Sequence, residues 1–163
     1  MSRTAEAESP SVVRVRADAA RRGLAIEPVR LAEGTRTAEA AAQACGCGLD
    51  QIVKSIVFRV SGSDRHVLFL TAGGHRVEPD AAAELVGAPL EKADAASVRA
   101  VTGFAIGGVA PVGHLTPLDT WLDPRLLDFP TVWAAAGTPH HVFPVAPDAL
   151  VRATGARVAD FAG

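Results

Sequence analysis

The chain has 163 residues, of which 48% are hydrophobic, so it is long enough for one domain with its own core and too short for two. Its net charge of −2 and its pI of about 6.2 exclude a generally basic surface, so any contact with nucleic acid must depend on local groups of arginines. No run of eighteen apolar residues occurs, and the first ten residues lack the apolar core of a secretory signal. We therefore expect a soluble, cytoplasmic protein that makes no membrane contact. Residues 1–163 are expected to form a single domain, with a flexible N-terminus over residues 1–8.

The first predicted element is a helix over residues 10–22. Ser9 can cap its N-terminus, Pro10 suits its first turn, and Gly23 follows its last residue as a stop signal. The charged residues of this helix fall on one face, and they are Arg14, Asp18, Arg21 and Arg22. Such a face is usually the solvated side of an amphipathic helix, and we predict that here. A patch that faces phosphate is the alternative interpretation.

A second helix is predicted over residues 38–45. Thr37 is placed to cap it and Gly46 to end it. Cys45 and Cys47 form a lone C-x-C pair at its end, without the second pair that a zinc site needs. We interpret these cysteines as reduced thiols, and the sequence predicts no metal site.

Residues 51–60, QIVKSIVFRV, form an apolar run rich in β-branched residues, with one ammonium group inside it. With the two-residue period of a strand, Lys54 shares a face with Ile56, Phe58 and Val60. Burying an unpaired amine is costly, so Lys54 either extends to the rim of the sheet or lies in a cavity that supplies acceptors or a ligand. The chain has 14 arginines and only two lysines, which makes lysine an unusual choice for an ordinary surface cation here.

The remaining elements alternate between strands and short helices. A turn at residues 61–64 separates two apolar runs, so residues 57–60 and 66–71 are expected to pair as an antiparallel hairpin. Asp80 and Asp94 are placed to cap the two helices that follow. Helices are predicted over residues 80–86, 95–101 and 147–154, strands over residues 115–122, 131–135, 141–145 and 157–160, and an extended piece over residues 26–31.

Two runs of 19 residues, 100–118 and 129–147, contain no charged side chain. Both are too rich in glycine, proline and histidine to be membrane helices, so we interpret them as the lining of a cavity. The first run includes GFAIGGVAPVGH at residues 103–114, where glycines permit a backbone that turns successive N–H groups toward one point. Such a loop can bind an anion or an oxyanion, and a tight loop between strands is the alternative.

Three motifs occur along the chain in a set order: QIVKSIVF, then TGFAIGGVAPVGH, then AGTP at residues 136–139 with the terminal ATGARVADFAG. They resemble the YbaK/ProX-like family of aminoacyl-tRNA deacylases, which are relatives of the editing domain of bacterial prolyl-tRNA synthetases. The resemblance runs from about Thr37 to the C-terminus. It implies an α/β fold of the mixed α+β kind, with a curved, mixed, mostly antiparallel sheet of about seven strands surrounded by helices. The pocket is implied between the lysine strand and the glycine-proline loop.

The resemblance also implies which residues form the site. Lys54 matches the lysine of the family, residues 107–111 match its G-x-x-x-P loop, and Gly137 lies in its second glycine loop. In the family these groups hold the terminal adenosine and the aminoacyl ester of a mischarged tRNA. A water activated with help from the ribose hydroxyl hydrolyses the ester, without a metal or other cofactor. The predicted catalytic residues are Lys54, Gly107 and Gly108, and the predicted substrate-binding residues are Val109, Ala110, Pro111, Gly113, His114, Asp123, Gly137 and Thr138.

Some of these roles have alternatives. Lys54 is expected to stay protonated as an electrostatic donor, whereas a lysine with a lowered pKa could act as a base or a Schiff-base nucleophile. No acidic or cationic residue adjacent in the sequence favours the second role. His114, like His140 and His141, could instead be a hydrogen-bonded structural residue. Asp123 either shapes the rim of the pocket or caps a following helix.

The function implied by the resemblance is trans-editing, which is hydrolysis of the ester of a mischarged tRNA, either tRNA-Pro or another tRNA that carries a small amino acid. The expected partner is the acceptor end of tRNA with its aminoacyl-adenosine, together with an aminoacyl-tRNA synthetase if the enzyme depends on one to grip the tRNA. The alternative is a regulatory module of the same fold that binds a nucleotide or aminoacyl-adenosine without turnover. The sequence contains no G-x-S-x-G or H-E-x-x-H motif, which fits a reaction without a serine nucleophile or zinc.

Overall fold

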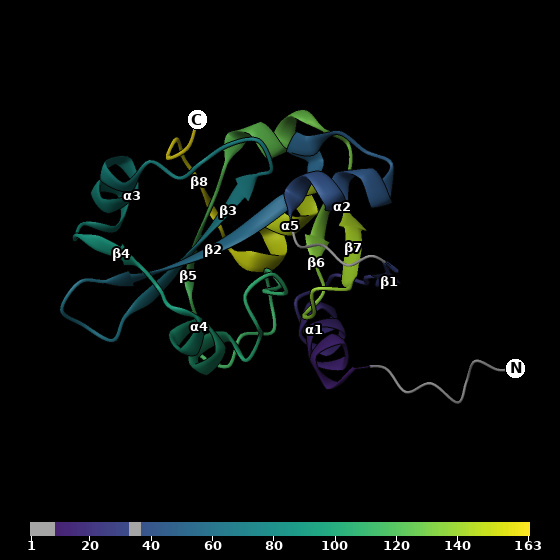
Figure 1. Ribbon diagram of the computed structural model, residues 1–163, viewed down its shortest axis with the longest axis horizontal. Helices are drawn as coiled ribbons and strands as arrows, with labels where there is room; N and C mark the ends of the chain where they lie inside the picture. Colours follow the sequence, from purple (N-terminus) through teal and green to yellow (C-terminus); the bar gives the residue numbers. More distant parts are fainter. Residues whose placement is uncertain (1–8, 33–36) are drawn as a thin grey trace, which may run out of the picture.

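The computed structural model describes residues 9–32 and 37–163, so the predicted flexible N-terminus at residues 1–8 lies outside it. Within these ranges the strands form two sheets with helices around them (Figure 1). The strands are β1 (Val29–Arg30), β2 (Val53–Val60), β3 (His66–Ala72), β4 (Leu90–Lys92), β5 (Asp119–Leu122), β6 (Val132–Ala135), β7 (His141–Val145) and β8 (Arg157–Val158). The helices are α1 (Pro10–Arg21), α2 (Ala38–Cys45), α3 (Pro79–Val86), α4 (Ala95–Thr102) and α5 (Pro147–Thr154), with 3₁₀ turns η2 (Leu49–Gln51) and η3 (Pro124–Asp128). The predicted mixed α/β class is therefore confirmed.

The larger sheet has the strand order β4-β2-β3-β5-β8. The predicted hairpin is confirmed, because β2 pairs antiparallel with β3 and places Lys54 opposite Thr71. β5 and β8 extend this sheet in parallel. Beyond Lys54, the same face of β2 continues through Ile56 and Phe58 into an apolar cluster with Ala82 of α3. The side chains of β2 therefore alternate between its two faces as the sequence predicts.

The smaller sheet has the order β1-β7-β6, with both pairs antiparallel. A parallel bridge between Ile52 and Trp133 connects it to the larger sheet. The strand pairs are mostly antiparallel, as expected, but the single predicted sheet is divided into two. The reason is that β2 and β6 meet at this bridge and then diverge, so a pocket rather than a ladder of hydrogen bonds lies beside residues 53–56.

Most helix ends agree with the sequence, but the strand predicted over residues 157–160 covers only Arg157–Val158, and two further elements differ. Thr37 and Asp94 cap α2 and α4 as predicted, by accepting amide hydrogen bonds at 3.0 and 2.7 Å. Asp80 caps nothing, because α3 already begins at Pro79 and its N-cap is Glu78. The strand predicted over residues 115–122 begins only at 119, because the amides of residues 115 and 116 bond back to the end of α4.

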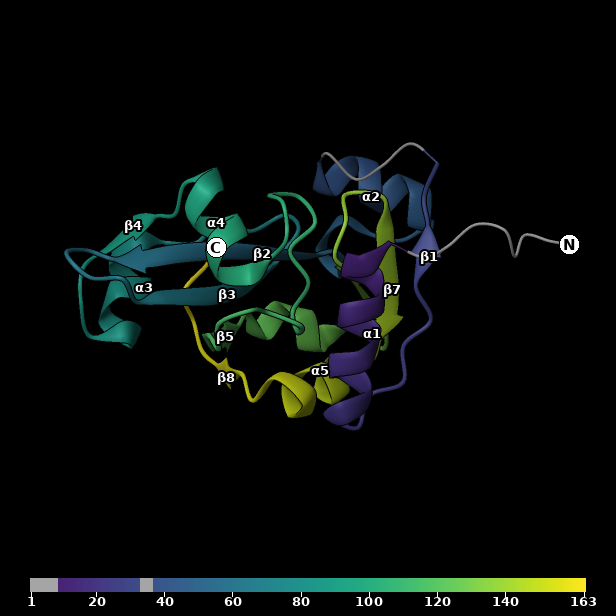
Figure 2. The same cartoon turned by 90° about the horizontal axis from the view of Figure 1, so that it is seen from below.

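The two sheets share one large apolar core. It contains Val15 of α1, Val57 of β2, Leu68 of β3, Phe143 of β7 and Leu150 of α5. Figures 1 and 2 place α3 and β4 at one end of the molecule, and α1, α2 and the small sheet at the other. The lysine strand therefore runs from one end toward the junction of the two sheets.

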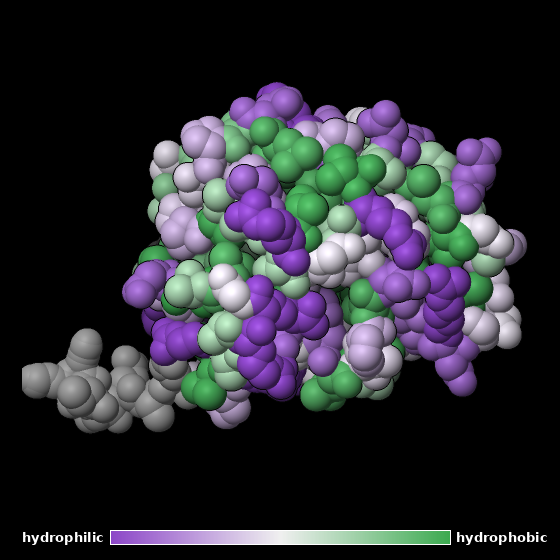
Figure 3. All heavy atoms as spheres, turned by 180° about the vertical axis from the view of Figure 1, so that it is seen from behind, coloured by the Kyte–Doolittle hydropathy of each residue, from purple (hydrophilic) through white to green (hydrophobic). Residues whose placement is uncertain are grey.

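On the face opposite to the view of Figure 1, the surface carries no large region that is entirely hydrophobic or entirely hydrophilic. Hydrophilic and hydrophobic side chains are intermixed there (Figure 3). Two of the most exposed large apolar side chains are Ile106, within the glycine-proline loop of residues 103–114, and Leu115, directly after it, which are 58% and 60% exposed. In the described part of the chain, no helix has the length and apolar character needed to cross a bilayer.

Candidate functional site

A pocket of about 240 Å³ lies between β2, the start of α2 and the glycine-proline loop at residues 103–114. The first uncharged run contributes Ile106, Gly107 and Val109 to its lining, and the second contributes Trp133, Ala135 and Val142. Both runs therefore line one cavity, as their composition predicted. Lys54 is the one charged side chain among the described residues that line this pocket.

The pocket opens against an edge of β2 that its neighbours leave uncovered. β4 pairs with β2 only over residues 58–60, and β6 meets it at Ile52. The carbonyl of Val57 points to this edge, where it accepts the amide of Ala93 at 3.2 Å. Main-chain groups alternate in direction along a strand, so the amide and carbonyl of Ser55 also point to the open edge. The hydroxyl of Ser55 is buried without a hydrogen-bond partner in the described structure, so Ser55 offers unpaired polar groups at the pocket.

Lys54 is half-buried, and its Nζ donates a hydrogen bond of 2.5 Å to the main-chain carbonyl of His75. An ammonium group has three N–H donors, so two remain for a ligand. Burial lowers the pKa of Lys54 below its ordinary value, and the positive charge of Arg76 lowers it further. The sequence showed no charged neighbour of Lys54, and it is the fold that brings Arg76 close.

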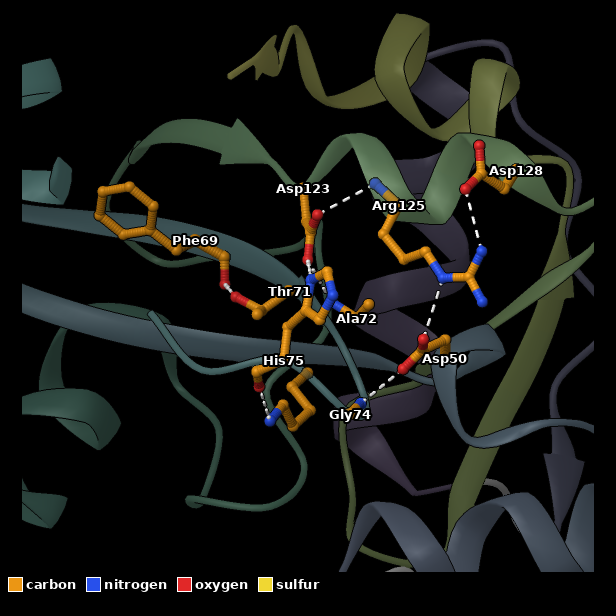
Figure 4. Close-up of polar contacts among 10 residues, drawn as sticks. Asp50, Phe69, Thr71, Ala72, Gly74, His75, Asp123, Arg125 and Asp128 are labelled. Atoms are coloured by element: carbon orange, nitrogen blue, oxygen red, sulfur yellow. Dashed lines mark hydrogen bonds and ion pairs between the residues drawn. The ribbon is translucent and has the colours of Figure 1, made fainter. Parts of the chain in front are cut away.

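A buried carboxylate fixes the side chain of His75 (Figure 4). Nδ1 of His75 lies 2.7 Å from Oδ2 of Asp123, and the same oxygen accepts the amide of Ala72 at 3.1 Å. The other oxygen, Oδ1, accepts the amide of Arg125 at 3.0 Å, so Asp123 caps η3. Asp123 is 2% exposed and is not among the residues that line the pocket. Of the two predicted roles of Asp123, the structure therefore shows the helix cap. Asp123 also holds the side chain of His75.

Asp50 fixes the other side of the turn that carries His75. Its Oδ1 accepts the amide of Gly74 at 2.8 Å, and its Oδ2 accepts Nε of Arg125 at 2.9 Å (Figure 4). The hydrogen bond from Arg125 is the main reason that the pKa of Asp50 is lowered, and it outweighs the effect of burial. A β-carbon on Gly73 would come within 2.2 Å of the carbonyl oxygen of Leu49, so only glycine fits there. The carbonyl that holds Lys54 thus belongs to a turn fixed from two sides.

The two glycines predicted as catalytic have different surroundings. Gly107 lines the pocket with φ of +92°, and a β-carbon there would meet no atom within 4 Å. Gly108 is pressed against the second glycine loop, since a β-carbon would come within 2.7 Å of the backbone of Thr138. The amide of Gly108 donates to the carbonyl of Ala105 at 2.9 Å, which leaves it unavailable to a ligand. Within the described residues, the amides of Gly107 and Val109 have no such partner.

Helix α1 anchors the far end of the glycine-proline loop. Nε of Arg14 donates to the carbonyl of Gly113 at 2.8 Å, and Asp18 accepts the amide of the same residue at 2.8 Å. Burial by itself raises the pKa of Asp18, but hydrogen bonds from Arg21, Gly113 and Arg22 outweigh it and hold this pKa below its ordinary value. The predicted solvated face of α1 is therefore wrong for Arg14 and Asp18. They are used inside the fold because the loop presents unpaired main-chain groups to them.

Several predicted substrate-binding residues lie away from the pocket. Pro111 and His114 line a separate hollow behind the loop, next to α1. Nε2 of His114 donates to the carbonyl of Ala110 at 2.7 Å, and burial lowers the pKa of this histidine, which favours its neutral form. A β-carbon on Gly137 would meet the backbone of Ser11 in α1 at 3.0 Å, so its open side faces the helix.

Thr138 belongs to the turn of the second glycine loop. Its hydroxyl lies 2.6 Å from Nδ1 of His141 and accepts the amide of His140 at 3.1 Å. The structure therefore brings together Lys54, Gly107 and Val109 around the pocket. The other predicted site residues do not line it. Sequence reasoning did not identify Ser55, His75, Asp50 or Arg76, and the one available signal was the Gly73-Gly74-His75 turn directly after a strand.

The described part of the chain contains no group of three or more His, Cys, Asp or Glu residues that could hold a metal ion. Cys45 and Cys47 are free thiols. Burial, with the nearby Cys47, raises the pKa of Cys45 to about 11, so this thiol is a poor nucleophile at neutral pH. The residues that line the pocket carry one ammonium, the hydroxyls of Thr37 and Ser55, and main-chain amides, a set suited to holding oxygen atoms of a polar ligand.

Most of the chain is similar to known proteins in sequence and in structure. Residues 32–153 match the aminoacyl-tRNA editing domain family. The uncharacterized protein YwhH of Bacillus subtilis (strain 168) is 32% identical over 114 residues, which cover 70% of this chain and 72% of that protein. A crystal structure described as a candidate trans-editing enzyme for prolyl-tRNA synthetase is 47% identical, with a TM-score of 0.90 over 96% of this chain and 99% of that one. The crystal structure of the hypothetical protein APE2540 is 29% identical, with a TM-score of 0.85 over 92% and 99%. The chain thus belongs to the YbaK/ProX-like family of aminoacyl-tRNA editing domains.

Proposed function

We propose that this protein is a cytoplasmic, single-domain trans-editing enzyme that hydrolyses the ester bond of a mischarged aminoacyl-tRNA without a metal ion. Membership of the editing-domain family supports action on aminoacyl-tRNA. The observation that carries the proposal is that Lys54, Gly107 and Val109 line one pocket, and that the amides of Gly107 and Val109 have no hydrogen-bond partner among the described residues. A serine or cysteine nucleophile with a base partner is not found among the described lining residues.

In the proposed reaction, water adds to the ester carbonyl carbon and the bond from that carbon to the ribose oxygen breaks. Negative charge develops on the carbonyl oxygen, and donors held in place before the reaction stabilise it. Lys54 supplies a positive charge whose position is set by its bond to His75, and Gly107 supplies a main-chain N–H. The proton lost by the water passes to the ribose oxygen with help from the neighbouring ribose hydroxyl. The products are the free amino acid and uncharged tRNA.

We further propose that the aminoacyl group is small and uncharged. The wall of the pocket near α2 is formed by Ala38 and Ala41, and Ala135 lies across it. These apolar residues offer no partner for a charged side chain, and Trp133 adds a bulky aromatic ring to the lining. A tRNA of the proline type, mischarged with such an amino acid, is the substrate that this wall and the 47% identical neighbour favour.

The test is a panel of tRNAs, each charged with a correct or an incorrect amino acid and assayed with and without a synthetase. We expect release of a small uncharged amino acid from a mischarged tRNA and no release from the correctly charged one. Tight binding of aminoacyl-tRNA without turnover on any member of the panel would instead indicate the regulatory module of the same fold.

A further inference from the structure

A second hollow of about 500 Å³ adjoins the pocket on the Lys54 face of β2. It lies between β2, β4 and the segment that leads from His75 into α3. We refer to it as the cationic groove. Its charged lining residues are Lys54, Arg76 and Lys92, and none of its described lining residues is acidic. Both lysines of a chain with 14 arginines and a net charge of −2 therefore line one groove.

Two of the positive charges of this groove, those of Arg76 and Lys92, have no carboxylate partner among the residues that the structure describes. Arg76 and Lys92 are exposed, and within the described structure neither side chain has a hydrogen bond or ion pair. Glu91, the neighbour of Lys92, is paired instead with Arg59 at 2.6 Å. Arg76 lies close enough to Lys54 for the two positive charges to repel each other, and an anionic ligand would weaken that repulsion.

The cationic groove and the pocket adjoin each other, because Lys54 and Ile56 line both. If the aminoacyl ester lies at Lys54, the nucleotides before the terminal adenosine must leave the pocket along one of its open sides. The groove is the side that carries positive charge. Its floor is apolar, with Ile56, Phe58 and Leu90, and such a floor suits ribose and base faces.

We propose that the cationic groove binds the phosphodiester backbone of the single-stranded acceptor end, directly before the terminal adenosine. Arg76 and Lys92 then contact phosphates, while Lys54 remains with the ester. This proposal depends on the proposed function for the direction of the RNA, but the phosphate contacts can be measured without any catalysis.

The experiment uses Arg76→Ala and Lys92→Ala, with Arg99→Ala as the matched control. Arg99 is an exposed arginine of α4, whose Val98 packs on the opposite face of β2 together with Val57. Each protein is assayed on a mischarged tRNA and on the corresponding 2′(3′)-O-aminoacyl-adenosine, which contains no phosphate. For the tRNA we expect each groove variant to raise KM about tenfold with kcat unchanged, and the salt dependence of log KM to fall by about 0.7 per lost phosphate contact. For aminoacyl-adenosine we expect no change with Lys92→Ala, and Arg99→Ala should match the wild type on both substrates.

If Lys92→Ala raises KM equally for the tRNA and for aminoacyl-adenosine, or for neither, the groove does not bind the phosphates, and the deacylase proposal still stands. If the wild type hydrolyses neither substrate, the proposed function fails, and the groove is tested by binding alone. The probe is then the 5′-phosphorylated trinucleotide CCA. Weaker binding to Arg76→Ala and Lys92→Ala than to Arg99→Ala supports the groove, and equal binding to all three overturns it.

Discussion

The carboxylate of Asp123 lies 2.7 Å from Nδ1 of His75, so a buried acidic residue at the start of η3 holds the turn that follows β3. The main-chain carbonyl of His75 in turn accepts the ammonium of Lys54. Asp123 therefore acts on the pocket through His75 rather than by contact with a ligand, and we regard both as positioning residues.

We predict that His75→Ala lowers kcat about tenfold and leaves KM nearly unchanged, because the acceptor of Lys54 is kept but is no longer held in place. Single-turnover hydrolysis of a mischarged tRNA measures this effect. The control is His66→Ala, which changes the histidine at the first residue of β3, whereas His75 lies three residues after its last. A folded His75→Ala variant with the kcat of the wild type would contradict the positioning role.

Removal of the ammonium itself should have a larger effect. We predict that Lys54→Ala lowers turnover about a hundredfold or more, which is the scale of losing one preorganised oxyanion donor. Lys54→Arg should recover only part of the activity, because a planar guanidinium places its charge differently. Circular dichroism checks that each variant is folded. Unchanged turnover of Lys54→Ala would remove Lys54 from the mechanism.

The lowered pKa of Lys54 has a consequence for stability. Burial and Arg76 hold the folded-state pKa below that of the unfolded chain, so between these two pKa values only the unfolded state keeps the proton. The free energy of unfolding should therefore rise with pH through this window, up to the ordinary lysine pKa of about 10.5. We predict that Lys54→Met raises the thermal midpoint at pH 7, because it leaves no charge to bury. The difference in thermal midpoint between Lys54→Met and the wild type should shrink as pH rises through the window. A constant difference between variant and wild type across this range would contradict the prediction.

The two glycines of the loop should respond differently to a β-carbon. Gly107→Ala meets open space but is strained at φ of +92°, so we expect a loss of about 1 kcal/mol in stability and a larger proportional loss of activity. Gly108→Ala must push the backbone of Thr138 away from 2.7 Å, so its thermal midpoint should fall further. The measurements are the thermal midpoint and the single-turnover rate for each variant. If both variants lose stability but keep their rate, the loop is scaffolding and the oxyanion site lies elsewhere, with Ser55 as the first candidate.

Activity should also survive chelation. The hydrogen-bond donors of the residues around the pocket are an ammonium, amides and two hydroxyls, and these are not the ligands that zinc or magnesium prefers. We predict that EDTA leaves the rate of hydrolysis unchanged. A reversible loss of activity that added zinc restores would overturn the metal-independent mechanism.

How far the sequence predicts this protein depends on the range of the interactions involved. Thr37, Asp94 and the hairpin of β2 and β3 were predicted correctly because caps, turns and the period of a strand are set by residues near one another in the chain. The orientation of Lys54 and the cavity lined by the two uncharged runs follow from the same local patterns and from composition. The family followed from three motifs in order, which needs no structure.

The tertiary structure alone decided how distant groups are combined. Arg14 and Asp18 read as solvent-facing, because nothing in their own helix shows that the main chain of Gly113 would be placed against them. In the same way, Asp123, His75 and Lys54 are connected only after β5 has aligned in parallel with β3. A buried polar group takes whichever partner the fold brings within reach, and that partner can lie tens of residues away. The sequence by itself thus determined the elements, the family and the central lysine, whereas the fold determined which side chains hold that lysine and which surround it with charge.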